Sequence, residues 1–383
     1  MNGFTEERRL GLRAKDGART RKRHRLRRLA ALWWIAATFL ILATGRADSA
    51  PISPFVEVCG MSLCVQGHPF TIHGGTAYDQ YGDPEGEVAR AKQAGLNILE
   101  IVEYETHHHQ LSDAMSEATW KRVDNFIAVA KANGLLVILN FSSYSQSLQA
   151  SGIKPTTTDW GPFLSFVTNR TNTVTGIKYS AEPAIAMYEL IGEIDAPNYA
   201  NPTRGTTAET TAFFGRTLAQ LKALDPNHLA SSGGMSYIND PKSGIDWQKI
   251  MAGQNNDVCD VEVNSLPDRN ISVPNVSNYC KGIGKPWFLS AWSACHDAKT
   301  GPHDINHWPG GDPDMAAHVA DMYQVERNTN PAPPGPAVAA VGSDFWNLAA
   351  TGSCALGPGY PQTFAVLERY AVKSLQPNPA PQK

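Results

Sequence analysis

Beyond Pro51, short apolar runs alternate with amphipathic stretches along most of the chain, and this alternation constrains the fold more than any other feature. Each apolar run has the length of a buried strand, and each amphipathic stretch has the apolar spacing of a helix that covers a sheet. The eight predicted strands are residues 70–73, 97–102, 135–139, 184–190, 229–232, 258–263, 286–289 and 338–346. The clearest predicted helices are residues 83–94, 116–133, 161–168, 208–224 and 363–372.

Eight strands that alternate with helices predict an α/β fold of the (β/α)8 TIM-barrel type. Such a barrel needs roughly 250 residues, and a chain of 383 residues, 42% of them hydrophobic, has room for one. A doubly wound open sheet is the alternative, but no Gly-x-Gly-x-x-Gly motif follows the first strand. We therefore predict one barrel domain at residues 51–375, followed by a disordered, Pro-rich tail at 376–383.

Residues 1–50 are predicted to form a separate basic region that directs export. The basic run RKRHRLRR at 21–28 directly precedes an apolar run at 29–45. A positive flank followed by an apolar stretch is typical of a signal peptide, and the length of this stretch is at the lower limit for a membrane span. Cleaved signal peptide and uncleaved anchor both remain open. The protein is expected to be secreted, or held at the cell surface through residues 29–45 if that segment is not cleaved.

Cysteine usage agrees with export, because all six cysteines follow the apolar run. An even number of cysteines after an export signal predicts disulfides. Among the 15 possible connectivities, our hypothesis pairs Cys59 with Cys64, which would close a small loop, and leaves Cys259 with Cys280 and Cys295 with Cys354. No Cys-x-x-Cys or paired histidine spacing favours a metal, and the run His107–His109 is interpreted as a loop, since consecutive side chains point in different directions.

The charge balance excludes one class of partner and leaves another open. A net charge of -3 with 18% charged residues provides no basic face for nucleic acid. A neutral sugar polymer is compatible with this surface. We expect no metal and no organic cofactor, and we expect the protein to act as a monomer.

In a (β/α)8 barrel the active site lies at the carboxyl ends of the strands, so acidic and aromatic residues that close a strand are the candidates. Glu193 is the best of them, because it follows the fourth predicted strand within the run 185–195. A glycosidase needs a carboxylic acid beside the scissile oxygen, and a crowded barrel mouth can raise the pKa of a glutamate toward that task.

Several motifs resemble family 5 of the glycoside hydrolases, in particular its endo-β-mannanase and cellulase-like members in the clan A barrels. The resemblance covers residues 65–372, and it rests on QGHPFTIHGGTAY at 66–78, GLN at 95–97, TVTGIKY at 173–179, YELIGE at 188–193, DPNH at 225–228 and FW at 345–346. It implies that Glu193 is the general acid/base and that Trp346 closes the eighth strand as a platform for a sugar ring. Tyr78, at the end of the first strand, is a second aromatic candidate.

The same resemblance exposes departures from the family pattern. The segment GKPWFLSAW at 284–292 is similar to the seventh strand of the family, but Ala291 stands where the nucleophilic glutamate is expected. Gly192 replaces an asparagine, Glu100 stands where an arginine is common, and Asn264 lies in a segment that replaces a histidine-bearing strand end. Asn264 is a candidate to hydrogen-bond a sugar hydroxyl. Two further candidates for substrate contact are Trp292 and Glu103.

Because a methyl group cannot form a glycosyl-enzyme, Ala291 leaves the mechanism open. One route is substitution by another carboxylate, for which the candidates are Glu103, Glu105, Glu262 and Asp297. Other routes are an inverting reaction or a nucleophile supplied by the substrate. A further alternative is that the chain is a nucleophile-to-alanine variant of an active parent.

We therefore expect an exported glycoside hydrolase that acts on β-linked polysaccharide or cell-wall glycan, such as mannan or glucan. An exo-acting furanosidase for galactofuranosyl or arabinofuranosyl residues is an alternative, since altered strand ends suit a different ring. A non-catalytic carbohydrate-binding barrel is the other alternative, and Ala291 motivates it.

Overall fold

The computed structural model describes residues 53–78, 80–102, 110–196, 204–240, 243–264, 268–294, 311–328, 336–350 and 354–374. The predicted basic region, the apolar segment at 29–45, the Pro-rich tail and both predicted boundaries of the barrel domain lie outside these ranges. Among the described residues, no helix combines the length and the apolar character that a membrane span requires.

Eight parallel strands form one sheet whose hydrogen-bonded order is β8-β7-β6-β5-β4-β11-β10-β9. The strands are β4 (Ile72–Thr76), β5 (Ile98–Ile101), β6 (Leu136–Asn140), β7 (Ile185–Glu189), β8 (Leu229–Ser231), β9 (Cys259–Val263), β10 (Trp287–Trp292) and β11 (Gly342–Phe345). Two backbone hydrogen bonds join the ends of this order: Asp257 N–H to Ala230 C=O at 2.8 Å and Glu262 N–H to Met235 C=O at 3.1 Å. The sheet thus curls into the predicted (β/α)8 barrel, and the open-sheet alternative is wrong.

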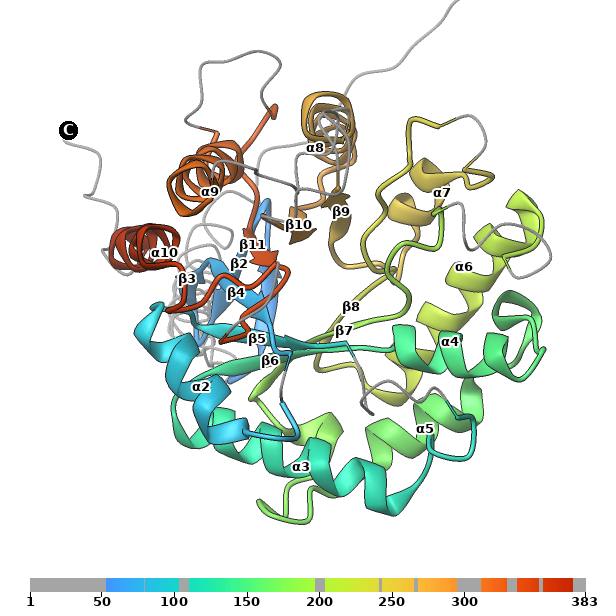
Figure 1. Cartoon of the computed structure of the whole chain (residues 1–383). Coiled ribbons are helices and arrows are strands. Elements are labelled where there is room, and N and C mark those ends of the chain that lie inside the picture. The colour runs from blue at the N-terminus through green and yellow to red at the C-terminus, as the bar shows by residue number, and fades with distance from the viewer. Residues whose placement is uncertain are drawn as a thin grey trace, which may run out of the picture. The chain divides into compact units, whose positions relative to one another are not determined.

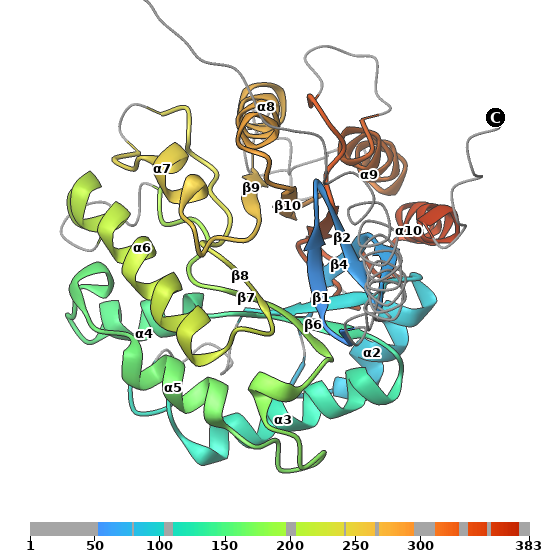
Figure 2. The same ribbon diagram turned by 180° about the vertical axis from the view of Figure 1, so that it is seen from behind.

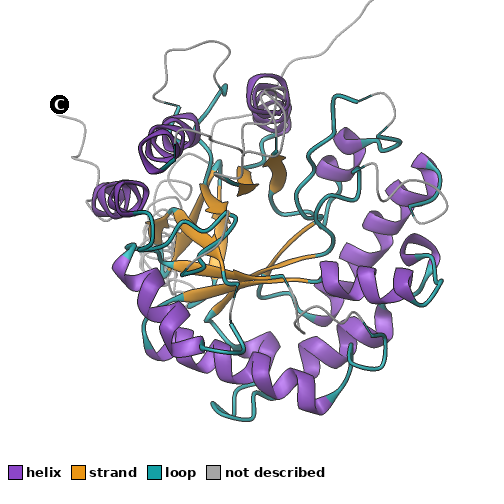
Figure 3. Ribbon diagram, in the orientation of Figure 1, coloured by secondary structure: helices purple, strands orange, loops and turns teal. Residues whose placement is uncertain are grey.

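Helices surround the strands on the outside (Figures 1 and 3). They are α2 (Pro84–Gln93), α3 (Glu117–Ala132), α4 (Ser142–Ala150), α5 (Gly161–Asn169), α6 (Thr207–Leu224), α7 (Trp247–Ala252), α8 (Val273–Ile283), α9 (Asp312–Glu326) and α10 (Pro361–Ser374). Short η elements lie at Pro155–Thr157, Tyr179–Ala181 and Asp268–Ser272. The five predicted helices are confirmed within a few residues, whereas α4, α7, α8 and α9 were not predicted.

Local sequence signals explain where several helices begin and end. Asp83 accepts a hydrogen bond from Gly86 N–H at the start of α2, and Thr206 forms a reciprocal capping box with Glu209 at the start of α6. These contacts satisfy backbone donors that have no partner inside the helix. Helix α3 ends at Ala132 and is capped by Asn133, and the next residue, Gly134, takes a φ of 76°, which a residue without a Cβ adopts at little cost.

One end of the barrel is covered by a small antiparallel sheet of β1 (Val56–Cys59), β2 (Ser62–Val65) and β3 (His68–Phe70). Figure 2, seen from behind, shows β1 and β2 lying across the barrel strands. Val56 and Leu63 of this sheet join Ile98, Met187 and Phe288 in one apolar cluster inside the barrel. The predicted strand at 70–73 is therefore wrong in its bounds: its first residue ends β3, and the barrel strand begins at Ile72.

The barrel interior changes from apolar to polar along the strands. Ile98 and Ile138 belong to the interior apolar cluster, and Glu100 and Asn140, two residues further along the same strands, line a pocket. Residues two apart on a strand face the same side. The inward-facing side chains therefore fill the barrel with an apolar layer, followed by a polar layer near the carboxyl ends of the strands.

The predicted disulfides are confirmed where the structure describes both cysteines. Cys59 is bonded to Cys64 across the β1–β2 turn, and Cys259 on β9 is bonded to Cys280 on α8. Cys354 is also disulfide-bonded, and its predicted partner, Cys295, lies outside the described residues.

Candidate active site

A pocket of about 290 Å³ opens at the carboxyl ends of the barrel strands. This volume is near the lower end of the range for small-ligand sites. Its lining comes from six of the eight strands or the turns that follow them, and it consists of Glu100, Val102, Asn140, Ser142, Gln146, Gly192, Glu193, Glu262, Asn264, Ser290, Ala291, Trp292, Ser293 and Trp346. The location is the one at which (β/α)8 enzymes carry their active sites.

Glu193 lies in the turn after β7 rather than in the strand itself, which ends at Glu189. Its backbone N–H donates to Gly234 C=O at 2.8 Å, and its φ of 54° is in the left-handed region that non-glycine residues seldom adopt. The side chain accepts a hydrogen bond from Asn264 Nδ2 at 2.7 Å. The Ser236 hydroxyl lies 3.4 Å from the same carboxyl oxygen, Oε1.

Burial raises the pKa of Glu193, and the hydrogen bonds from Ser236 and Asn264 oppose that rise by stabilising the charged form. A raised pKa keeps a carboxyl group protonated closer to neutral pH. The environment of Glu193 therefore suits a group that gives up a proton to a leaving group.

Asp195 holds the neighbouring loop in place. Its carboxylate accepts hydrogen bonds from the backbone N–H groups of Ser236, at 3.1 Å, and Tyr237, at 2.6 Å. Burial raises the pKa of Asp195 to about 7, against the effect of these two donors. Through this contact the turn after β7 fixes the segment after β8, and with it the position of the Ser236 hydroxyl beside Glu193.

Glu262, on β9, also reaches the pocket. Its Oε2 lies 3.1 Å from the Ser236 hydroxyl, so Glu262 and Glu193 contact the same oxygen atom. Burial and the negative charges of Glu193 and Asp195 raise the pKa of Glu262 well above its usual value. Two like charges this close cannot both be ionised without a large cost.

Further buried carboxyl groups lie on the barrel strands β5, β7, β9 and β11. Asn140 Nδ2 donates to Glu100 at 2.9 Å and to Glu189 at 3.0 Å. Burial raises the pKa of Glu189 well above its usual value, and that of Asp260 to about 7, while burial and nearby Glu100 raise the pKa of Asp344. In the described part of the chain, none of the recorded ion pairs involves these groups or Glu262. The same ranges contain no cluster of His, Cys, Asp and Glu arranged to hold a metal ion.

The aromatic candidates occupy different environments. Trp346 is half-buried at the pocket, and its ring meets that of Tyr78 edge to face, with centroids 6.0 Å apart. Tyr78 is 46% exposed. Trp292 borders the pocket, but its indole is 1% exposed and packs against Tyr323 and Phe345. An indole this buried offers little surface to a sugar ring, so the expected sugar contact by Trp292 stays a prediction.

The structure brings together Glu193, Ala291, Asn264 and Trp346 from four predicted strand ends. Glu103, Glu105, His107–His109 and Asp297 lie outside the described residues. Sequence reasoning missed Ser236 and Asp195. The segment SSGGMS at 231–236 follows the fifth barrel strand, and its two glycines are the only local sign that the backbone there approaches other groups closely.

Comparisons with known proteins place this geometry in context. No family model matches the chain. The chain is 26% identical over 212 residues to mannan endo-1,4-beta-mannosidase 8 of Oryza sativa subsp. japonica, covering 46% of this chain and 56% of that protein. It is 22% identical over 223 residues to mannan endo-1,4-beta-mannosidase 7 of Arabidopsis thaliana, covering 49% and 50%. The chain thus spans about half the length of these curated relatives.

Solved structures agree in fold. The endo-1,4-beta-mannanase from Rhizomucor miehei has a TM-score of 0.63 at 16% identity, covering 84% of this chain and 99% of that one. A glycoside hydrolase family 5 mannosidase from the same organism has a TM-score of 0.58 at 15% identity, covering 84% and 98%. The chain is therefore similar in sequence to mannan endo-1,4-beta-mannosidases and shares the barrel fold of these solved structures. Within the pocket, Gly192, Glu262 and Ala291 lie next to one another.

Proposed function

We propose that the protein is an exported glycoside hydrolase that cleaves β-linked mannan or a similar β-linked polysaccharide, with Glu193 as the general acid/base. The observation that carries the proposal is the position of Glu193: it reaches the strand-end pocket with a pKa raised by burial, and Trp346 lines the same pocket. A flat indole suits the apolar face of a sugar ring. Export is supported by the disulfides.

Mannan is proposed as substrate because the relatives with detectable sequence similarity are named as mannan endo-1,4-beta-mannosidases. The barrel geometry alone fits many sugars, since one fold supports unrelated specificities through its strand ends and loops. The furanosidase alternative has no observation in its favour. A binding-only barrel is favoured by one feature, the methyl side chain of Ala291 at the pocket.

The first test is release of reducing sugar by the full chain from a panel of mannan, glucan, xylan, galactan and arabinan. We expect hydrolysis of mannan, and a loss of about 10²–10⁴-fold in Glu193→Gln, the range that a general acid contributes. Activity confined to a furanoside substrate would replace the mannan proposal with the furanosidase alternative. Tight glycan binding without turnover, unchanged in Glu193→Gln, would contradict the hydrolase and support the binding barrel.

A further inference from the structure

Glycosidases of the two-carboxyl type need a second acidic group near the acid/base, and the strand position expected to provide it holds Ala291. The neighbouring strand supplies a carboxyl group at the same level. β9 and β10 pair in parallel, and Ala291 on β10 is the register partner of Glu262 on β9. Both residues line the pocket that contains Glu193. A carboxyl group is therefore present beside the alanine, but it comes from the adjacent strand.

Small residues around Glu262 create the room for its side chain. A Cβ at Gly234 would lie 2.2 Å from Glu262 Cγ, and a Cβ at Gly192 would lie 2.9 Å from Glu262 Oε1. Real Cβ atoms do not approach so closely, so any larger residue at Gly234 would force Glu262 to move. Gly192 and Ala291, which both depart from the family pattern, thus flank the carboxyl group that occupies this space.

The Ser236 hydroxyl limits how protons are arranged between the two glutamates. Its oxygen contacts Glu193 Oε1 at 3.4 Å and Glu262 Oε2 at 3.1 Å, and it accepts a hydrogen bond from Asn264 Nδ2 at 2.8 Å. A hydroxyl carries one hydrogen, so it can donate to only one of the two carboxyl groups. The other contact is satisfied when that carboxyl group is protonated and donates to the serine oxygen. The geometry therefore favours one proton shared by the pair.

We propose that Glu262 is the second catalytic carboxyl group, the nucleophile in place of the residue missing at position 291, and that Ser236 relays a proton between it and Glu193. This inference rests on the proposed glycoside hydrolase function. Because the two carboxyl groups contact one oxygen, at 3.4 and 3.1 Å, they lie close enough to be compatible with the about 5–5.5 Å that retaining glycosidases use between their carboxyl groups.

Glu262, Ser236, Glu193 and one water molecule are sufficient for the complete reaction. Glu262 passes its proton to the Ser236 oxygen as Ser236 passes its own to Glu193, which leaves Glu262 ionised and Glu193 protonated. Glu193 then protonates the glycosidic oxygen, the bond from that oxygen to the anomeric carbon breaks, and Glu262 forms an ester to this carbon. Water gives a proton to Glu193 and attacks the anomeric carbon, the ester bond breaks, and the sugar leaves with its anomeric configuration retained.

The other buried acids of the described chain are placed less well for this role. Glu100 lines the pocket, but both of its carboxyl oxygens already accept hydrogen bonds, one from Thr76 and one from Asn140. Glu189 and Asp260 do not line the pocket. Glu262 is also the one whose carboxyl group is joined to Glu193 through a common hydrogen-bonding partner.

The decisive experiment traps the ester in the unmodified full chain, so that no variant has to fold. The chain is incubated with a 2-deoxy-2-fluoro-β-mannobiosyl fluoride, in which the fluorine slows ester hydrolysis, and the labelled peptide is identified by mass spectrometry. We expect one glycosyl group, attached to Glu262. A label on Glu193, or on any residue other than Glu262, would overturn the proposal.

Kinetics of variants on mannan provide the second arm. We expect Glu262→Gln to lower kcat by about 10⁴-fold, the scale on which removal of a nucleophilic unit acts. Glu326→Gln is the matched control: Glu326 is also buried and also accepts a hydrogen bond from a serine, Ser343, but on α9 outside the barrel. It should stay within about threefold of the parent, because it touches no pocket group.

The role of Ser236 as a positioning residue is tested by Ser236→Ala. We expect kcat to fall at least about tenfold, as for lost proton-transfer assistance, with KM unchanged and a displaced pH profile. If the parent hydrolyses mannan while Glu262→Gln retains activity within about threefold, Glu262 is not the nucleophile and the proposed function stands. If the parent hydrolyses no glycan in the panel, the proposed function fails and this inference fails with it.

Discussion

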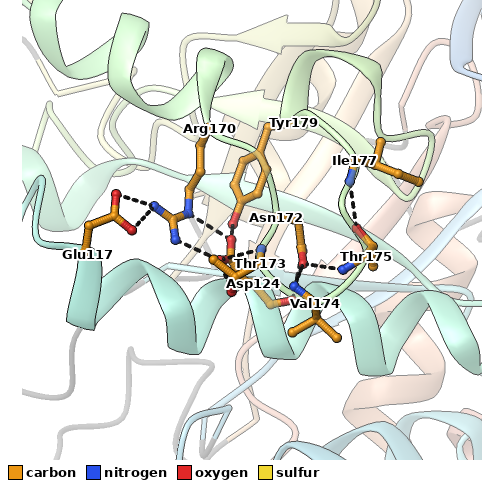
Figure 4. Close-up of polar contacts among 9 residues, drawn as sticks. All are labelled: Glu117, Asp124, Arg170, Asn172, Thr173, Val174, Thr175, Ile177 and Tyr179. Atoms are coloured by element: carbon orange, nitrogen blue, oxygen red, sulfur yellow. Dashed lines mark hydrogen bonds and ion pairs between the residues drawn. The ribbon is translucent and has the colours of Figure 1, made fainter.

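Two buried clusters of this protein differ in whether a positively charged side chain compensates the carboxyl group. On the outside of the barrel, Asp124 of α3 is fully buried and receives two hydrogen bonds from the Arg170 guanidinium, at 2.8 and 2.7 Å (Figure 4). Thr173 and Tyr179 donate to the same carboxylate. Inside the barrel, Glu262 shares one hydroxyl group with a second glutamate and forms no ion pair with any of the residues that the structure describes.

The pKa values follow this difference. Although burial of Asp124 acts to raise its pKa, the hydrogen bonds from Arg170, Thr173 and Tyr179 prevail and lower it. For Glu262, burial and the charges of Glu193 and Asp195 act together and raise the pKa. A cluster that holds the fold together compensates each buried charge, whereas a site that moves protons keeps its carboxyl groups close and poorly compensated.

Removal of the cation should produce the largest change in stability. We expect Arg170→Met to lower the free energy of unfolding by about 3–5 kcal/mol, because it leaves Asp124 buried without its partner. Chemical denaturation at pH 7 measures the effect. Glu117 contacts Arg170 from an exposed position, so Glu117→Gln is a control that should cost less than about 1 kcal/mol. Equal effects of the two substitutions would contradict a special role for the buried pair.

Ala291→Glu, which places a carboxyl group on the seventh barrel strand, tests the proposed catalytic role of the inner cluster. Ala291 pairs in register with Glu262, so a glutamate at position 291 would enter the same pocket. We expect Ala291→Glu alone to lower activity, since it crowds a third acid into the site. Combined with Glu262→Gln, it should recover about 10²-fold over the single Glu262→Gln variant, near the upper end of coupling between residues in contact. The measurement is kcat of the parent, of each single variant and of the double variant. If the effects of the two substitutions on log kcat simply add, this coupling is contradicted.

The pH dependence of stability should reflect the buried acids with raised pKa values more than the outer cluster. Burial raises the pKa values of Asp195, Asp260 and Glu326 to about 7. A carboxyl group with a raised folded-state pKa contributes stability that is present below its unfolded-state pKa of about 4 and is lost as the pH rises through the folded-state value.

We therefore expect the free energy of unfolding to fall by on the order of 1–3 kcal/mol between pH 5 and pH 8. Denaturant unfolding at half-unit steps of pH measures this slope. Asp124 has the opposite sign, because its lowered pKa makes its contribution disappear only at acid pH. If the free energy of unfolding instead rises between pH 5 and pH 8, ionisation of Asp195, Asp260 and Glu326 does not destabilise the folded state.

The smallest expected effect is the gain in stability from Glu189→Gln, which replaces one buried carboxyl group by an amide. Burial and the charge of Glu100 raise the pKa of Glu189, and its Oε2 already accepts from Asn140. Glu189→Gln keeps an acceptor there and removes the acid, so at pH 8 it should stabilise the fold by up to about 1 kcal/mol, with a smaller gain at pH 5. Asp124→Asn, the matched change in the outer cluster, should destabilise at both pH values.

Much of the fold was predictable because it depends on local patterns. Apolar runs at 97–102 and 184–190 became β5 and β7, since a strand buried on both faces needs apolar residues in succession. The antiparallel sheet β1–β3 was missed, because its short strands at 56–70 carry mixed polar and apolar residues around turns. Helices α8 and α9 were also missed, because the apolar residues in that part of the sequence show no clear helical spacing.

The candidate site was predictable in part. Glu193 and Trp346 follow predicted strands, and the barrel brings strand ends together, so both were expected at one mouth. Ser236 and Asp195 were missed, because a serine in a glycine-containing loop has no distinctive spacing. The burial of Trp292 was also not predictable, since an aromatic residue at a strand end can face the mouth or the helices.

The sequence by itself determined the barrel, the acid after the fourth strand and the absence of a carboxyl group at Ala291, because these depend on residue type and on spacing along one segment. Only the tertiary structure decided that Glu262 faces Ala291. The register between β9 and β10 shifts between Leu289 and Ala291, and a shift of one residue turns a side chain to the other face of a sheet. Whether two carboxyl groups from β9 and the β7 turn meet at one serine depends on how the closed barrel sets that register.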